Sequence, residues 1–329
     1  MPARRADPAT LAEAVAGGDR AALARAITLV ESTREDDRAA AERLLAALLP
    51  RTGGATRLGI SGAPGVGKST FIEAFGLMLI GAGRRVAVLA VDPTSKRAGG
   101  SILGDKTRMP RLSRAEAAFI RPSPAGTSLG GVARRTRDAM LIAEAAGFDI
   151  IIVETVGVGQ SETTVADMVD LFLLLIAPGG GDDLQGIKKG IVELADLVIV
   201  NKDDGDLAPA ARRAVADYRH ALRLLTPAAG ADAVDALAVS SLEERGFDKV
   251  WGIAVARLDA ARASGAFAAR RRAQALAALW RDIGDGLMDL FRADETAARL
   301  LSEIEGQVSA GKLTPSAAAR QALAAFRRG

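Results

Sequence analysis

The stretch GAPGVGKST at residues 62–70 decides the fold of this chain. It fits the phosphate-binding pattern G-x-x-x-x-G-K-[ST] without a mismatch. The run RLGIS at 57–61 predicts a short buried strand before it, and residues 70–80 predict a helix after it. In that order, the loop amides and the positive end of the helix point at the same anion. The stretch therefore predicts a P-loop that binds a nucleoside triphosphate; the plainer alternative is a glycine-rich turn with a chance lysine.

Two side chains of this loop have predicted roles in the chemistry. Lys68 would reach the outer phosphates, and Ser69 would hold a magnesium ion through its hydroxyl. We expect the whole loop to contact the nucleotide, and it consists of Gly62, Ala63, Pro64, Gly65, Val66, Gly67, Lys68, Ser69 and Thr70.

Short, continuous apolar runs later in the chain predict strands that are buried on both faces. They lie at 86–91, 150–153, 171–176, 197–200 and 236–239. Helical stretches between most of them predict an α/β fold with a doubly wound, mostly parallel sheet. We expect three parts, which are an N-terminal helical segment at 1–55, a P-loop domain at 56–262 and a C-terminal helical arm at 263–329.

Helix signals mark both ends of the chain. Thr10 and Asp19 are candidate N-caps near the start, and Thr314 is a cap followed by proline at the first helical position. An apolar stripe outside the P-loop domain favours a homodimer arm over packing on the chain's own sheet. This stripe is formed by Leu276, Leu279, Trp280, Ile283, Leu287 and Phe291.

Composition excludes several kinds of chemistry. The 329 residues include no cysteine, which rules out disulfides and thiolate metal sites, and one histidine, His220. Zinc chemistry, Ser-His catalysis and imidazole ligation of cobalt or haem are therefore not expected. A net charge of +3 with 4% aromatic residues argues against a nucleic-acid surface. Neither a signal or transit peptide nor a membrane-spanning run is predicted, so we expect a soluble, cytoplasmic protein.

Two carboxylates follow predicted strands, at the edge where ligands bind in open α/β sheets. Asp92 comes directly after the strand at 86–91 and would hold magnesium or its water. Glu154 lies in the run VETVG, which resembles the D-x-x-G turn of GTPases. In that turn the carboxylate orients a magnesium-bound water, and the glycine, here Gly157, senses the γ-phosphate. A helix cap is the ordinary alternative for each carboxylate.

The run NKDD at 201–204 follows another apolar strand and matches the guanine-reading pattern N-K-x-D of GTPases. Spacing selects Asp204, whose carboxylate would accept hydrogen bonds from the ring imino group and the exocyclic amine of guanine. Adenine lacks that pair, so the carboxylate would be left unpaired at a cost of about 1–3 kcal/mol. The other predicted base contacts are Asn201, Lys202, Ser240, Ser241 and Leu242.

Two polar, glycine-rich loops remain, at 96–108 and 178–189. The first has the composition of a switch that orders on a γ-phosphate, and Asp105 is its candidate magnesium-shell carboxylate. The second is a candidate for gating or partner contact, with a simple strand-to-helix connection as the alternative.

Taken together, the motifs resemble those of the methylmalonyl-CoA mutase-associated GTPases of the MeaB type. The resemblance rests on GAPGVGKST, VDPTS, GGSILGDKTRM, VETVGVGQSE and APGGGDDLQGIKKGIVELADLVIVNKDD, and it is dense from about 57 to 262. It implies a GTP-hydrolysing chaperone that binds methylmalonyl-CoA mutase or a related cobalamin-dependent acyl-CoA mutase. Such a protein gates adenosylcobalamin loading and protects the mutase from inactivation. The resemblance also implies a homodimer formed through the C-terminal arm.

The resemblance also assigns roles to residues of this chain. Lys68 and Ser69 would hold phosphate and magnesium. The acidic metal shell would be Asp92, Asp105 and Glu154, and the guanine readers would be Asn201, Lys202 and Asp204. Position 203 carries aspartate where family members commonly have alanine, and we do not expect this change to disturb specificity.

Hydrolysis would be phosphoryl transfer to water, achieved mostly by positioning and charge stabilisation. Gln160 and Gln185 are candidates for orienting the water. Lys188 or Arg108 would supply positive charge once a partner orders its loop. We expect slow intrinsic turnover that the mutase accelerates.

Three other functions fit parts of the sequence. A nickel-delivery GTPase usually needs Cys and His ligands, which this chain lacks or nearly lacks. An ATP-dependent transport-associated kinase would show no preference for GTP. A nucleotide-gated scaffold would keep its function after hydrolysis is abolished.

Overall fold

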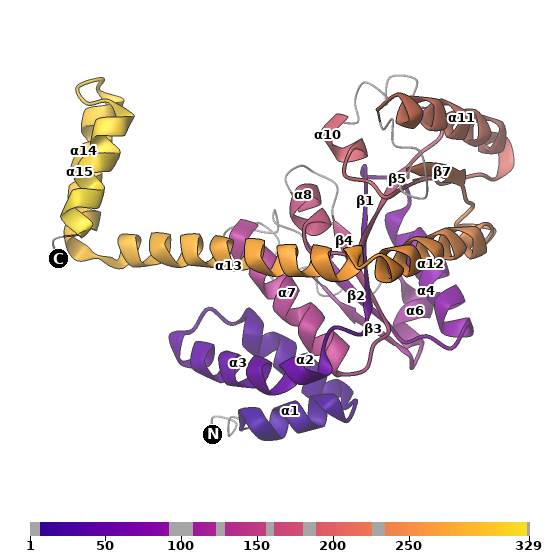
Figure 1. Cartoon of the computed structure of the whole chain (residues 1–329), viewed down its shortest axis with the longest axis horizontal. Coiled ribbons are helices and arrows are strands. Elements are labelled where there is room, and N and C mark those ends of the chain that lie inside the picture. Colours follow the sequence, from indigo (N-terminus) through magenta and orange to yellow (C-terminus); the bar gives the residue numbers. More distant parts are fainter. Residues whose placement is uncertain are drawn as a thin grey trace. The chain divides into compact units, whose positions relative to one another are not determined.

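The computed structural model describes residues 7–91, 108–122, 129–155, 161–179, 189–225 and 234–327. Among these residues, seven parallel strands form one sheet with helices on both sides (Figure 1). The strands are β1 (Thr56–Gly62), β2 (Val86–Val91), β3 (Ala118–Arg121), β4 (Ile150–Thr155), β5 (Leu171–Ile176), β6 (Leu197–Val200) and β7 (Asp235–Ala238). The predicted α/β class with a doubly wound parallel sheet is confirmed.

Helices occupy both ends of the chain and the connections between strands. Before the sheet come α1 (Pro8–Ala16), α2 (Arg20–Glu31), α3 (Glu35–Leu48) and the 3-10 turn η1 (Leu49–Arg51). Between strands lie α4 (Lys68–Gly81), α6 (Pro110–Arg114), α7 (Leu129–Ala145), α8 (Ser161–Ala166), α10 (Lys189–Val192), η3 (Gly205–Leu207) and α11 (Ala208–Leu225). The chain continues with α12 (Phe247–Ala263), α13 (Ala266–Ala293), α14 (Glu295–Ser309) and α15 (Pro315–Phe326).

The strand order β3-β2-β4-β1-β5-β6-β7 places β1 at the centre of the sheet. Strand β1 pairs in parallel with β4 on one side and with β5 on the other. The P-loop therefore begins at the carboxyl edge of the central strand, where ligands bind in doubly wound sheets. Strand β3 was not predicted, because its four residues carry no periodic signal that separates them from a loop. It becomes a strand through its parallel pairing with β2.

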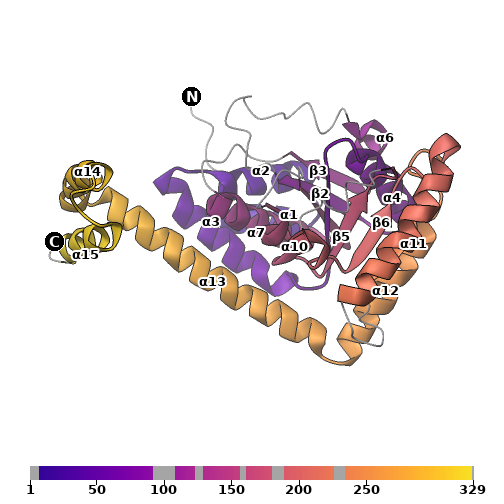
Figure 2. The ribbon, with the colours of Figure 1, turned by 90° about the horizontal axis from the view of Figure 1, so that it is seen from above.

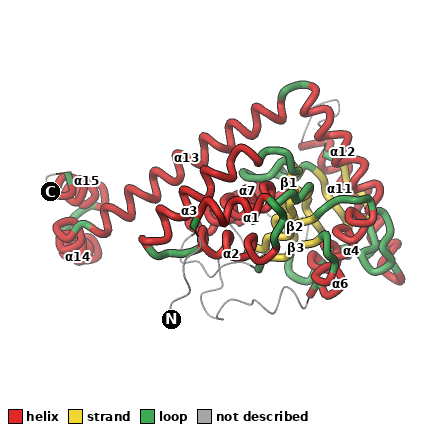
Figure 3. The backbone as a smooth tube through the Cα atoms, turned by 90° about the horizontal axis from the view of Figure 1, so that it is seen from below, coloured by secondary structure: helices red, strands yellow, loops and turns green. Residues whose placement is uncertain are grey.

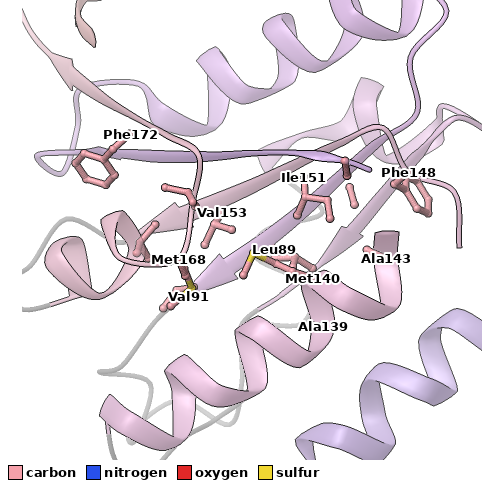
Figure 4. Close-up of a cluster of buried hydrophobic side chains, with 14 of the residues drawn as sticks. Leu89, Val91, Ala139, Met140, Ala143, Phe148, Ile151, Val153, Met168 and Phe172 are labelled. Carbon is pink, nitrogen blue, oxygen red and sulfur yellow. The ribbon is translucent and has the colours of Figure 1, made fainter. Parts of the chain in front are cut away.

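Side chains that alternate along each strand build a core on each face of the sheet. One core joins the strands to α1, α2, α3 and α7, and the other joins them to α4, α6 and α12. Figures 2 and 3 show these two groups of helices on opposite sides of the strands. In the first core, Leu89 of β2 and Val153 of β4 face Met140 of α7 (Figure 4). Buried apolar side chains on both faces explain why the strands read as unbroken apolar runs.

The N-terminal helices contribute to this same core. Leu23, Ile27 and Leu44 are fully buried, or nearly so, within it. Helix α2 begins after Asp19, whose carboxylate accepts hydrogen bonds from two backbone amides, so this predicted cap is confirmed. The prediction for Thr10 is wrong, because Asp7 caps α1 and accepts from the Thr10 amide at 3.3 Å. Proline at position 8 starts the helix three residues earlier than a cap at Thr10 would have started it.

A buried ion-pair network holds the first turns of α13. Arg271 donates to both carboxylate oxygens of Asp170, at 2.8 and 2.6 Å, and to the carbonyl of Ala55 at 2.7 Å. The Asp170 side chain is 1% exposed and also accepts from the Arg57 amide at 2.8 Å. Burial lowers the pKa of Arg271, but the hydrogen bond and charge of Asp170 outweigh it and leave that pKa raised. The network attaches α13 to the amino ends of β1 and β5.

The chain divides into two compact units, residues 1–274 and 275–329. In the second, α14 and α15 pack around the buried Ile304, and the Phe291 and Phe326 rings lie 5.5 Å apart. Thr314 caps α15 through the Ala317 amide, as predicted. The predicted boundaries after 55 and 262 stay predictions.

No helix among the described residues is both long and apolar enough to cross a lipid bilayer.

Candidate nucleotide-binding site

Close approaches of the backbone require glycine at two positions of the P-loop. Gly62, at the end of β1, has φ +155°, and a Cβ there would lie 2.3 Å from the carbonyl oxygen of Leu175. Gly67 has φ +94°, and a Cβ there would lie 2.7 Å from Nδ2 of Asn201. A side chain at either position would force the loop away from its neighbours. The loop is therefore shaped by the strands beside it as well as by its own sequence.

Lys68 lies inside the loop, with 9% of the residue exposed. Its ammonium donates to the carbonyl oxygens of Gly62 at 2.7 Å and Ala63 at 3.2 Å. Burial lowers the pKa of Lys68, and the charges of Glu154 and Glu162 offset this only in part. Helix α4 begins at this lysine, and its N-cap, Gly67, supplies no side-chain cap. The first-turn amides and the ammonium thus form a positive site at the sheet edge.

Ser69, in the first turn of α4, lies next to Glu154 of β4. The Ser69 hydroxyl is 3.4 Å from Oε1 of Glu154, which is 8% exposed on β4 beside Ile60 of β1. A hydroxyl next to a carboxylate is the kind of oxygen donor set that Mg²⁺ prefers, so these residues fit that ion. Within the described ranges, no three Asp, Glu, His or Cys residues form a metal-binding cluster.

Asn201 connects the loop after β6 to the P-loop. It is 2% exposed, and its Nδ2 donates to the carbonyl oxygen of Val66 at 2.9 Å. Its Oδ1 accepts from the amide and hydroxyl of Ser241, at 3.2 and 2.7 Å. Lys202, with φ +62°, donates to the carbonyl oxygen of Gly65 at 3.0 Å. One asparagine side chain therefore bridges the phosphate loop and the loop after β7.

Asp204 is partly exposed beside this bridge. Its Oδ2 accepts from the hydroxyl of Ser240 at 2.5 Å, which orients the carboxylate. Ser240 and Ser241 are buried, whereas Leu242 is 79% exposed. The structure thus brings together Asn201, Lys202, Asp204 and the two serines, and it leaves Leu242 at the surface.

Asp203 lies between the motif residues and is buried, with 7% exposed. Its Oδ2 accepts from Arg245 at 3.1 Å, and its carbonyl oxygen accepts from the same guanidinium at 2.5 Å. Sequence reasoning missed Arg245, because nothing local to the run SSLEER predicts its partner 42 residues earlier.

Several predicted site residues lie outside the described residues. They are Asp92, Asp105, Gly157, Gln160, Gln185 and Lys188. Arg108 is described and exposed, and its charge lowers the pKa of Lys68. Sequence reasoning also missed Glu162, which is 2% exposed and whose charge acts on Lys68. The signal that could have found it is its position eight residues after Glu154, in the first turn of the next helix.

A P-loop bonded to an N-K-x-D loop at one edge of a parallel sheet defines a P-loop GTPase. The family model described as "Methylmalonyl Co-A mutase-associated GTPase MeaB" matches residues 23–296. This chain belongs to that family and is a GTPase.

Individual relatives are similar to nearly the whole chain. A Caulobacter vibrioides protein named as a GTPase is 56% identical over 96% of this chain and 97% of its own length. The mouse protein named "Methylmalonic aciduria type A homolog, mitochondrial" is 46% identical over 94% of this chain and 77% of its own. The crystal structure titled "LAO/AO transport system kinase" is 40% identical, with a TM-score of 0.78 and coverage of 99% of both chains.

Proposed function

We propose that this GTPase binds methylmalonyl-CoA mutase or a related cobalamin-dependent acyl-CoA mutase. Hydrolysis of GTP would time the loading of adenosylcobalamin and protect the mutase from inactivation. The family match across residues 23–296 carries this proposal, because the family is described as mutase-associated. The mouse relative, named for methylmalonic aciduria, supports the same partner. The chain's own lack of Cys and its single His agree with a protein that does not itself ligate the cofactor metal.

The proposed site holds the GTP phosphates in the loop at 62–70 and guanine at Asp204. The support is the network that joins these two positions through Asn201, which bonds to Val66 and to Ser241. Adenine would leave the Asp204 carboxylate without its two donors, so GTP is favoured over ATP. Lys202 would stay with the phosphate loop, where its ammonium already contacts the Gly65 carbonyl.

Magnesium would be held by Ser69 and Glu154, with Asp92 and Asp105 as further proposed ligands. When bound, the ion would neutralise charge on the phosphate oxygens. Lys68 would leave the loop carbonyls for the outer phosphates and add positive charge where negative charge develops. We propose Gly157 as the residue that senses the γ-phosphate and Gln185 as the residue that orients the water. Lys188 is proposed to supply positive charge to the transferred phosphoryl group.

A homodimer through the C-terminal arm is the proposed assembly. Three large side chains of the predicted stripe are well exposed on α13, since Leu279, Trp280 and Leu287 are 52%, 71% and 55% exposed. Apolar surface of this kind favours burial against a partner of the same pattern.

Phosphate release from GTP, with and without purified mutase, tests the proposal. We expect slow turnover alone and strong acceleration by the mutase, and Lys68→Ala should be inactive in both conditions. Equal rates with and without mutase would contradict the partnership while leaving the GTPase intact.

The transport-kinase alternative is separated by the same assay run with ATP. A kinase would turn over ATP as readily as GTP and would transfer the phosphoryl group to a protein. Selective GTP turnover with release of free phosphate would contradict that function.

A further inference from the structure

We propose that Asp203 and Arg245 are positioning residues that set the guanine selectivity of this site. Their contacts lock the loop carrying Asp204 onto the loop after β7. The inference rests on the proposed reading of guanine by Asp204, and it assigns a role to a position that the N-K-x-D pattern leaves open.

Asp203 is held from three directions. Its amide donates to the carbonyl oxygen of Val239 at 2.9 Å. Its own carbonyl oxygen accepts from Nη2 of Arg245 at 2.5 Å, and its carboxylate accepts from Nη1 at 3.1 Å. The carboxylate side chain is only 9% exposed. Hydrogen bonds donated by a charged guanidinium are stronger than neutral ones, and Arg245 directs two of its donors to this one residue.

Arg245 also closes the loop after β7. Its backbone amide and carbonyl pair with Ser240 in an antiparallel bridge, at 3.0 and 3.1 Å. The Ser240 hydroxyl in turn donates to the Asp204 carboxylate at 2.5 Å. The contacts form a closed ring that runs from Asp203 through Arg245 and Ser240 to Asp204. Asp203 and Asp204 are thus both hydrogen-bonded to the short turn between Ser240 and Arg245.

The residue before Asp203 has an unfavourable backbone conformation that neighbouring contacts must hold in place. Lys202 has φ +62°, a conformation that residues with a Cβ rarely adopt and that persists when surrounding contacts enforce it. Without the Arg245 contacts, the turn at 202–204 can relax toward ordinary backbone angles. The Asp204 carboxylate would then no longer be oriented toward the two guanine donors. Recognition of the base would weaken as a result.

Competition against a fluorescent GDP analogue tests this inference, with GDP, inosine diphosphate and ADP as competitors. Inosine diphosphate lacks the exocyclic amine of guanine. The ratio of the affinities for GDP and inosine diphosphate, called here the GDP-to-inosine ratio, therefore reports how well Asp204 is oriented toward that amine. For Asp203→Ala, Asp203→Asn and Arg245→Ala we expect GDP to bind about five- to tenfold more weakly. The GDP-to-inosine ratio should fall several-fold, because inosine diphosphate loses less. The double change Asp203→Ala with Arg245→Ala should be no worse than the more severe single change.

Two controls separate aiming from general destabilisation. Arg219→Ala breaks an exposed 2.9 Å ion pair with Asp235 in the same part of the fold. Arg212→Ala removes an arginine that is 72% exposed and 3.7 Å from Asp203. Both should leave the GDP-to-inosine ratio unchanged. If Asp203→Asn and Arg245→Ala lower the melting temperature without changing that ratio, the inference is overturned.

Asp204→Ala distinguishes failure of the inference from failure of the assigned site. If Asp204→Ala removes the preference for GDP over ADP while the changes at 203 and 245 alter no ratio, only the inference fails. If Asp204→Ala keeps that preference, the base-reading role fails and the inference falls with it. Should Asp203→Ala not fold, Asp203→Asn retains the size of the side chain and Arg245→Lys retains its charge.

Discussion

Gly65 and Gly67 of the P-loop share a positive φ but differ in what surrounds them. Their φ angles are +81° and +94°. A Cβ on Gly65 would meet no atom within 4 Å, whereas one on Gly67 would meet the buried amide of Asn201. The pair therefore separates backbone strain from steric crowding.

We expect Gly65→Ala to lower the free energy of unfolding by about 1–2 kcal/mol, which is the strain of a left-handed alanine. Gly67→Ala should lower it by roughly a further 1–3 kcal/mol, because Asn201 must move. Denaturant unfolding of the nucleotide-free variants measures both.

Combining Gly67→Ala with Asn201→Ala removes the crowded amide. The added penalty of Gly67→Ala should shrink in that background. A penalty of the same size in both backgrounds would show that crowding by Asn201 is not its cause.

Residue identity alone identified only part of this site. Spacing within N-K-x-D selected Asp204, because that pattern is local. The expectation that position 203 is neutral conflicts with our assignment of a positioning role, since Asp203 is buried against Arg245. That contact joins residues 42 positions apart, which no local pattern encodes.

At the scale of elements, Asp19 caps α2 with two hydrogen bonds, from the amides of Ala21 at 2.7 Å and Ala22 at 2.9 Å. These bonds favour the charged carboxylate, led by the one from Ala22, and lower the pKa of Asp19. A carboxyl with a lower pKa in the folded state adds stability above its unfolded pKa. That stability is lost as pH falls through the folded pKa.

Asp19→Asn keeps the cap but removes the charge. We expect the wild type to be the more stable at neutral pH, and the difference to vanish in acid. Unfolding by denaturant along a pH series measures this, with Asp217→Asn on an exposed helix face as baseline. A difference that persists unchanged into acid would count against the charge effect.

Arg271 attaches α13 to the sheet through carboxylates that are nearly inaccessible. Replacing it with methionine leaves Asp170 and Glu144, each 1% exposed, without this partner. We expect a loss of about 3–5 kcal/mol in the free energy of unfolding, because buried charges are left uncompensated.

The neighbouring Arg270 provides a matched control. It is 40% exposed and lies 3.6 Å from Asp196. Arg270→Met should change stability by less than about 1 kcal/mol, as exposed ion pairs do. Equal effects at 270 and 271 would contradict the special role of the buried network.

Strand prediction succeeded where a run consisted wholly of apolar residues. The runs at 86–91, 171–176 and 197–200 match β2, β5 and β6 residue for residue. Strand β3 was missed, because its run AFIR ends in an arginine and is recognised as a strand only by its pairing with β2.

At the scale of the whole molecule, the exposed stripe of α13 predicts self-association. We expect the full chain to be a dimer by light scattering, and Trp280→Glu combined with Leu287→Glu to be a monomer. Charged side chains in an apolar interface oppose its burial. The phosphate-release rate without mutase should change little, since the substitutions lie outside the proposed site.

Leu49→Glu is the control, because Leu49 is 58% exposed but lies on the turn after α3. This variant should remain a dimer. A wild-type chain that is monomeric at all concentrations would contradict the proposed arm.

The sequence by itself determined the class of the protein. Its P-loop, its alternation of strands and helices and its N-K-x-D run each depend on local physics, namely glycine φ angles, apolar periodicity and fixed motif spacing. The tertiary structure decided which residues of these elements come into contact. Only folding brings Asn201 against Gly67, Arg245 against Asp203 and Arg271 against Asp170, and these contacts join residues from 42 to more than 100 positions apart. Tertiary structure alone determines such pairs, because each residue's partner lies on an element that the local sequence does not specify.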